Sequence, residues 1–320
     1  MNTARIVKLQ TAVCALSLLL LSACGQTAPA APLPTITAAA FPTDAPASTV
    51  TPISTNTNTP EPTTIPGVQI YPISSLGKSI PWLPLDEGNK PMSVYFGFNV
   101  NKPPFDNAVV RQAFAAAIDR EQVAKEAKGF KFRNVTPATS LTPSQTLGQD
   151  LYGDIGIPFD PARAKDLLNQ AGYPGGESFP SVTLIVSTRG QDAPEAYTEL
   201  AQTIIGMWKT HLGVDVNLEV ESNWGQYLNI LKGNSRDIYE MGWGADINDP
   251  DNFLKFLFYS TSEFNYGRFN NPEFDRLVDR AATLSDPLER QLLYIQAEEI
   301  LTETEAGVIP LFHSLYYLRP

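Results

Sequence analysis

The sequence contains little of the side-chain chemistry on which most catalytic and metal sites depend. Of its 320 residues, only two are cysteine and two are histidine. Cys14 and Cys24 both lie close to the N-terminus, so the remainder of the chain carries no thiol. Disulfides, cysteine-based zinc sites and thiol catalysis are therefore excluded for the folded part.

Catalytic motifs are also missing. The sequence has no Gly-x-Ser-x-Gly, no His-Glu-x-x-His and no Gly-x-x-x-x-Gly-Lys pattern. His211 falls at the end of a predicted helix, where a cation meets the helix dipole favourably, and we interpret it as structural. His313 falls inside an apolar strand, which is typical of a buried core or interface residue. We expect a protein that is not an enzyme and that holds neither a metal nor a cofactor.

Positive charge is scarce as well. The chain has 34 acidic and 23 basic residues, for a formal net charge of −11. This balance argues against binding to nucleic acid and against docking on anionic lipid.

The N-terminus is typical of an export signal. Arg5 and Lys8 precede an apolar run from Val13 to Leu21, which is too short to span a bilayer. The run ends in Leu-Ser-Ala-Cys-Gly, which resembles the lipobox of bacterial lipoproteins. We therefore predict that residues 1–23 are a signal peptide and that Cys24 is lipidated. The alternative is an ordinary cleaved signal with a chance cysteine.

Residues 24–67 differ in composition from the rest of the chain. After Cys24 they consist largely of Pro, Thr and Ala, with Asp44 and Glu61 as the only charges and Phe41 as the only aromatic residue. Such a segment cannot bury enough apolar surface to offset its ordering entropy. We predict an extended tether, with a glycosylated stalk as the alternative, followed by a folded part at residues 68–320.

Hydrophobic periodicity predicts an α/β fold for that part, with strands alternating with helices. The predicted helices begin near capping residues, after Asp106, at Asp160-Pro161 (ending at Gly172), at Pro194 (ending at Leu212), at Asn271-Pro272, and at Asp286-Pro287 with Glu289 in a capping box. The predicted strands are residues 182–188, 214–221, 237–243 and 308–318.

One dense polar cluster, residues 246–252, follows the strand at 237–243 directly. It fails as a calcium loop because Asp251 stands where glycine is needed and Leu257 stands where glutamate is needed. Its position is more informative, because loops after the carboxyl ends of strands hold ligands in α/β folds. Two interpretations stay open: a ligand site with Trp243 as an apolar wall, or a buried Trp243 with Asp246 as a turn or cap residue.

Many segments resemble, in order, the motifs of family 5 extracellular solute-binding proteins, which are the oligopeptide, dipeptide and nickel receptors of ABC importers. The resemblance extends over effectively all of residues 94–320. The matching segments are Phe98–Asn107, Val110–Glu121, Asp160-Pro161 to Gly172-Tyr173, Met207–Val214, Gly242–Asp246, Asp249–Phe253, Asn271–Asp275 and Ile309–Leu311.

The resemblance implies one lobe of a class II periplasmic-binding-protein-like fold, with a mixed sheet flanked by helices. In peptide-binding members, the Asp of Gly-Trp-x-x-Asp receives the α-ammonium of the ligand, and here that residue is Asp246. The ligand-binding residues implied in this way are Asp246, Trp243, Gly244, Ala245 and Trp224. Trp224 also fits a core face with Leu228 and Leu231. At the position of Glu240, some peptide binders carry a basic residue for the carboxylate of the ligand.

Family members are about twice as long and have two lobes, whereas only the second lobe is matched here. We therefore expect a shortened substrate-binding lipoprotein in the cell envelope, either anchored to the outer face of the cytoplasmic membrane or periplasmic. Its partners would be a peptide or other small solute, ABC permease subunits and a separate first lobe. The alternatives are a surface-tethered interaction module without its own ligand and a receptor for nickel or another small solute. An apolar face on the hinge side would indicate that the lobe expects a partner.

Overall fold

The computed structural model describes residues 90–129, 132–143, 146, 155–188 and 194–316. All of them belong to one compact unit, Ile70–Pro320. The predicted signal peptide, the lipidated Cys24 and the tether lie outside the described residues. Within those residues, no helix combines the length and the apolar character needed to span a bilayer.

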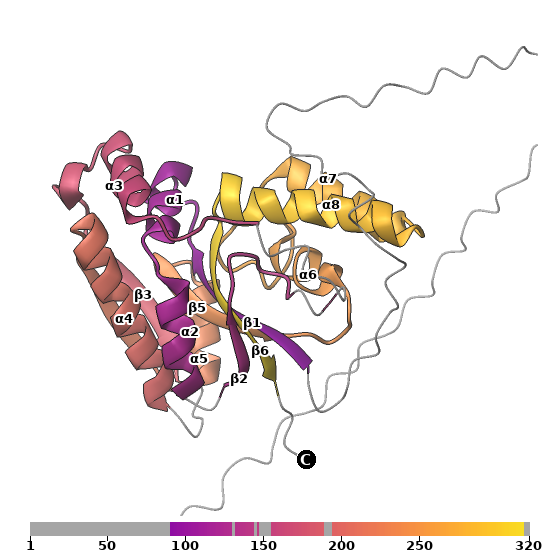
Figure 1. Cartoon of the computed structure of the whole chain (residues 1–320), viewed down its shortest axis with the longest axis horizontal. Coiled ribbons are helices and arrows are strands. Elements are labelled where there is room, and N and C mark those ends of the chain that lie inside the picture. The colour runs from indigo at the N-terminus through magenta and orange to yellow at the C-terminus, as the bar shows by residue number, and fades with distance from the viewer. Residues whose placement is uncertain (1–89, 130–131, 144–145, 147–154, 189–193, 317–320) are drawn as a thin grey trace, which may run out of the picture. The chain divides into compact units, whose positions relative to one another are not determined.

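A six-stranded mixed sheet, in the order β2-β6-β1-β5-β3-β4, forms the centre of the described part (Figure 1). The strands are β1 (Lys90–Phe98), β2 (Arg133–Pro137), β3 (Val182–Ser187), β4 (Val216–Glu221), β5 (Ile238–Gly244) and β6 (Val308–Tyr316). β1 pairs antiparallel with both β5 and β6, whereas β3 pairs parallel with both β4 and β5. The α/β architecture expected from the sequence, a mixed sheet flanked by helices, is confirmed.

Helices cover both faces of this sheet. The first group is α1 (Ala108–Ala116), α2 (Arg120–Gly129), α3 (Pro161–Gln170) and α4 (Pro194–Leu212). The second group is α5 (Trp224–Lys232), α6 (Lys255–Phe258), α7 (Pro272–Thr283) and α8 (Pro287–Glu299). Figure 1 shows α1 to α4 together on one side, with α6, α7 and α8 on the other.

Local side chains set the starts of these helices. Asp160 caps α3, Asn271 caps α7 and Asp286 caps α8, each by accepting hydrogen bonds from backbone N–H groups of the first turn, as the sequence predicts. The predicted cap of α1 is wrong by one residue. Asn107, not Asp106, stands in extended backbone before the helix, and its Oδ1 accepts from Val109 N at 2.9 Å.

Two cores flank the sheet. The first core joins α1 to α4 to one face, which includes Val94 and Phe96 of β1. The second core joins α5 to α8 to the other face, which includes Tyr95 of β1. β1 is buried along almost its whole length because it contributes alternate residues to both cores. Such a strand shows no polar–apolar alternation, and neither β1 nor the short β2 was predicted from the sequence.

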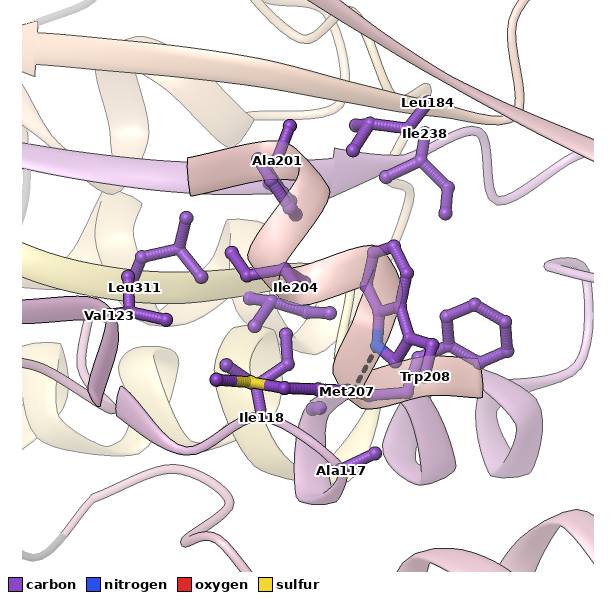
Figure 2. Close-up of a cluster of buried hydrophobic side chains, with 14 of the residues drawn as sticks. Ala117, Ile118, Val123, Leu184, Ala201, Ile204, Met207, Trp208, Ile238 and Leu311 are labelled. Carbon is purple, nitrogen blue, oxygen red and sulfur yellow. Dashed lines mark hydrogen bonds between the residues drawn. The ribbon is translucent and has the colours of Figure 1, made fainter. Parts of the chain in front are cut away.

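Trp208 of α4 organises the first core. Figure 2 shows its indole among Ile204, Met207 and residues of the sheet such as Ile238. The ring lies 5.0 Å from that of Phe114 and 6.0 Å from that of Phe96, between centroids. Its Nε1 donates to Phe114 O at 3.0 Å, so the buried polar atom is satisfied.

Candidate ligand-binding site

The motif Gly242–Asp246 lies where β5 leaves the sheet. Trp243 pairs with Ser93 of the central strand, and Ala245 N donates to Pro91 O at 2.8 Å. Ala245 is fully buried in the second core, whereas Asp246 is exposed to solvent. Of the predicted ligand residues, Ala245 therefore fixes the backbone, and the next residue presents its carboxylate at the surface.

Three parallel strands end at this edge of the sheet. Because β3, β4 and β5 run in the same direction, the start of α5 after β4 lies at the same edge as the motif after β5. Trp224, the first residue of α5, is 39% exposed, and its ring stacks on that of Tyr227 at 5.5 Å. Trp224 thus lies at the surface, stacked on a buried residue of the core face that also holds Leu231. This edge is where α/β proteins hold ligands.

Asn252 joins the two halves of the candidate site. Its Oδ1 accepts a hydrogen bond from Trp243 Nε1 at 3.1 Å and another from Asp246 N at 2.9 Å. The Asn252 side chain is buried, so one amide oxygen fixes both the indole and the backbone of the carboxylate-bearing residue. Asn252 lies within a motif noted in the sequence, but no spacing rule indicated that it would bond to both residues.

An ion pair holds the rest of the 246–252 loop against α8. The guanidinium of Arg290 bonds to both oxygens of Asp249, with Nη2 and Oδ1 2.9 Å apart, and its Nη2 also donates to Tyr294 Oη at 2.8 Å. Tyr294 Oη in turn donates to Asp251 Oδ1 at 3.0 Å. Burial is the main cause that raises the pKa of both Asp251 and Tyr294. Burial opposes the charge of Arg290, yet the hydrogen bond to Asp249 leaves its pKa raised.

This network also gives the acidic cluster its structural role. Asp249 and Asp251 face Arg290 and Tyr294, so two of the three carboxylates of the loop support its conformation. Among the described residues, no group of three His, Cys, Asp or Glu side chains is placed to hold a metal ion. The third carboxylate, Asp246, is the one that the loop leaves at the surface.

Trp243 is half-buried beside two phenylalanines. Its ring lies 5.2 Å from that of Phe256 and 5.4 Å from that of Phe264, between centroids. Neither sequence interpretation describes this arrangement fully, because one side of the indole packs on the second core while the cluster reaches the surface. Gly244 is partly exposed next to it, as a backbone contact with a ligand would need.

Glu240, in contrast, lies inside the molecule. Its side chain is 2% exposed, and the residue pairs with Phe96 in the middle of the sheet. Because side chains alternate along a strand, Glu240 and Trp243 face opposite sides of β5. The carboxylate of Glu240 therefore does not reach the ligand edge.

Both histidine side chains make contacts that support the fold. His211 lies in the last turn of α4, as predicted, with its ring 5.5 Å from that of Phe159. His313 is buried in β6, where its Nε2 bonds to Ser140 O at 2.9 Å. Burial lowers the pKa of His313 to about 4.

Glu298 of α8 is a buried carboxylate that the sequence did not indicate. It accepts hydrogen bonds from Leu141 N, from Thr142 N and, at 2.7 Å, from Thr142 Oγ1. Burial raises its pKa to about 7. A glutamate near the end of a helix normally faces water, so no sequence signal could have revealed that this one anchors a loop.

One open cavity lies elsewhere, at the start of α1. It measures about 610 Å³, and its lining includes Pro103, Pro104, Asn107 and Tyr173. None of the predicted ligand residues lines it, so it does not compete with the β5 edge as the candidate site.

Comparison with known proteins agrees with this fold and motif. Residues 53–265 match the family model of bacterial extracellular solute-binding proteins, family 5, middle region. Heme-binding protein A of Haemophilus influenzae is 34% identical over 226 residues, which are 69% of this chain and 39% of that protein.

Solved structures give the same result. The murein tripeptide-binding protein MppA of Escherichia coli aligns with a TM-score of 0.60 at 30% identity, over 73% of this chain and 45% of that one. A dipeptide-binding protein from Pseudoalteromonas sp. SM9913, in complex with Met-Leu, aligns with a TM-score of 0.61 at 27% identity, over 72% of this chain and 44% of that one.

The chain thus spans about 40% of the length of the curated relatives it matches, and the family model covers most of the chain itself. These matches agree with the order of motifs along the sequence and with the arrangement of the sheet. The chain belongs to family 5 of the bacterial extracellular solute-binding proteins.

Proposed function

We propose that this protein is a substrate-binding lipoprotein of a peptide-type ABC importer and that it is not an enzyme. The observation that carries the proposal is the exposed carboxylate of Asp246, presented by a loop that Asn252 and Arg290 hold in place. A preformed site of this kind loses little freedom on binding, which favours a ligand that is read by a few fixed polar groups.

Asp246 would receive the α-ammonium of a peptide. A charge-assisted hydrogen bond to this group recognises the amino terminus of a peptide whatever its side chains are. Backbone groups near Gly244 would hold the peptide main chain in the manner of an added strand. The side chains would then lie against Trp243 and Trp224.

Full affinity would need a second lobe. Two-lobed receptors bind by closing around the ligand, which doubles the contacts and excludes water. We propose that a separate first lobe supplies these contacts, together with the permease subunits that accept the solute. The lobe by itself should therefore bind peptides weakly.

We further propose that Cys24 carries the lipid anchor and that residues 24–67 tether the lobe at the cell envelope. Replacing Cys24 by Ser should release the protein from the membrane fraction and abolish incorporation of labelled fatty acid. Retention of either property in the variant would contradict the anchor.

Calorimetric titration with tripeptides tests the binding function. Asp246→Ala should weaken binding at least 10-fold, because a charge-assisted bond contributes more than 1.4 kcal/mol. Asp215→Ala is the matched control, since Asp215 is another exposed carboxylate and pairs with Lys209 at the surface. If the lobe, with a first lobe supplied, bound no peptide, or if Asp246→Ala left the affinity unchanged, the proposed function would be wrong.

A further inference from the structure

Three aromatic side chains form a continuous wall beside the candidate site. The wall consists of Trp243, Phe256 and Phe264, and the rings of Phe256 and Phe264 stack at 4.6 Å between centroids. Phe256 is 40% exposed, and Ile247 next to Asp246 is 54% exposed. Large apolar side chains gathered at the surface mark places where a ligand or partner covers them.

The wall is rigid as well as exposed. Ser262 Oγ donates to Phe256 O and accepts from Phe264 N at 3.2 Å, so one hydroxyl ties the backbones of the two phenylalanines together. Asn252 ties the third ring to the backbone of Asp246, through the two bonds to its Oδ1. The indole of Trp243 and the backbone of Asp246 are therefore held in one arrangement.

The exposed charges next to the wall in the chain are acidic. Lys255 precedes Phe256, but its ammonium pairs with Asp279 at 3.0 Å and lies over the ring of Tyr259. Glu263 precedes Phe264 and is exposed, as Asp246 is, so the wall offers ring faces and edges beside carboxylates. An acidic ligand side chain would lose hydration there beside like charges, whereas an aromatic one would gain ring contacts.

We propose that this site selects peptides whose amino-terminal residue is apolar, and aromatic by preference. This inference rests on the proposed function, because it takes the α-ammonium to be at Asp246. In an amino acid, the ammonium and the side chain are attached to the same carbon. A peptide held at Asp246 therefore places its first side chain within a few bond lengths of the carboxylate, where the wall of Trp243, Phe256 and Phe264 stands.

A series of tripeptides X-Ala-Ala, with Phe, Leu, Ala or Lys as X, tests this selection by calorimetry. Phe-Ala-Ala should bind roughly 10-fold more tightly than Ala-Ala-Ala, because one ring contact together with the buried ring area contributes about that factor. The variant Phe256→Ala should reduce this preference to about 2-fold, measured as the ratio of the affinities for Phe-Ala-Ala and Ala-Ala-Ala in the same variant.

Phe159→Ala is the matched control, because Phe159 is also 40% exposed but lies beside His211. It should keep the full preference for Phe-Ala-Ala. Equal affinities across the series would overturn the selection and leave peptide binding intact, whereas no binding of any peptide, with a first lobe supplied, would contradict the proposed function itself.

The oligomeric state separates a ligand wall from a self-association surface. Light scattering after size exclusion should show the same mass for the purified protein and for Phe256→Ala. A dimer that this substitution converts to monomer, with the peptide preference unchanged, would overturn the inference in favour of contact between copies of the chain.

Discussion

The two faces of the sheet differ in what their side chains hold in place. On the first-core face, aromatic rings follow one another from Phe98 through Phe105 and Phe114 to Trp208, with centroids 4.7 to 5.0 Å apart. On the second-core face, hydrophobic packing is combined with ionisable groups that hold loops, among them the buried Glu298 and Asp249 and the half-buried Arg290. The first-core side also buries two charged groups, Arg111 and Arg120, whose guanidiniums donate to the backbone carbonyls of Phe105 and Pro310.

The second face also positions loops. Its ionisable groups bond to the 246–252 loop and to residues 141–142, and each bond fixes a direction as well as a contact. Burying such groups is costly unless they are fully bonded, and it adds little net stability. The difference between the faces teaches that both sides combine packing with buried charge, but that the bonds which position the candidate-site loop lie on the second-core side.

The largest effect on the free energy of unfolding is expected when one tryptophan on each face is replaced by alanine. Trp208→Ala should lower the free energy of unfolding by roughly 3–5 kcal/mol, because it removes a fully buried ring and leaves a cavity. Trp243→Ala should cost about 1–2 kcal/mol, because that ring is only half-buried and its neighbours can close over the gap. Urea denaturation measures both free energies of unfolding. Equal losses of stability in the two variants would contradict the difference between the faces.

The second-core face should also make stability depend on pH in two opposite ways. Burial raises the pKa of Glu298 from 4.5 to about 7, so its contribution is fully present below about pH 4.5 and is lost as the pH rises through 7. Burial lowers the pKa of His313 from 6.5 to about 4, so its contribution is present above about pH 6.5 and is lost as the pH falls through 4. Each shift corresponds to roughly 3 kcal/mol.

Denaturation between pH 4 and pH 8 separates the two groups. Glu298→Gln should remove the loss on the alkaline side only, and His313→Asn should remove the loss on the acid side only. Stability curves of the variants that run parallel to the curve of the original protein would show that neither group titrates as its environment indicates.

The smallest effect on stability, but the most specific, is expected at Asn252. Asn252→Ala leaves Trp243 Nε1 and Asp246 N without their acceptor, which should cost about 1–2 kcal/mol. The fluorescence emission of Trp243 should shift because its indole is no longer fixed. The contribution of Trp243 is found by comparing the spectral change that Asn252→Ala causes in the original protein with the change that it causes in the variant Trp243→Phe. An unchanged spectrum would mean that Asn252 does not position the ring.

Much of the fold could be predicted because it depends on neighbouring residues. Asp160-Pro161 and Asn271-Pro272 open α3 and α7 through bonds to N–H groups two or three residues away. Pro194–Leu212 was predicted with the bounds that α4 has, since its apolar stripe repeats at the helical period. β1 escaped prediction because a strand buried on both faces carries no alternating pattern.

The candidate site was likewise predictable only where it depends on neighbouring residues. The motif Gly242–Asp246 and its place at the end of a strand were readable from the sequence, as was the family resemblance that the comparisons bear out. The bonds that position the motif join residues far apart in the chain, such as Asp249 with Arg290 and Glu298 with Leu141. Phe256 and Phe264 likewise lie beside Trp243 only because the chain turns back at Ser262.

By itself, the sequence determined the α/β class, most helix starts and the scarcity of thiol and imidazole chemistry in the folded part, because composition, caps and periodicity act over a few residues. Only the tertiary structure decided that Glu240 is buried, that Trp224 is exposed and that Asp246 is exposed whereas Asp249 is buried and Asp251 half-buried. Which side of a strand or loop meets water depends on the helices that pack against it, and those contacts join residues separated by tens of positions in the chain.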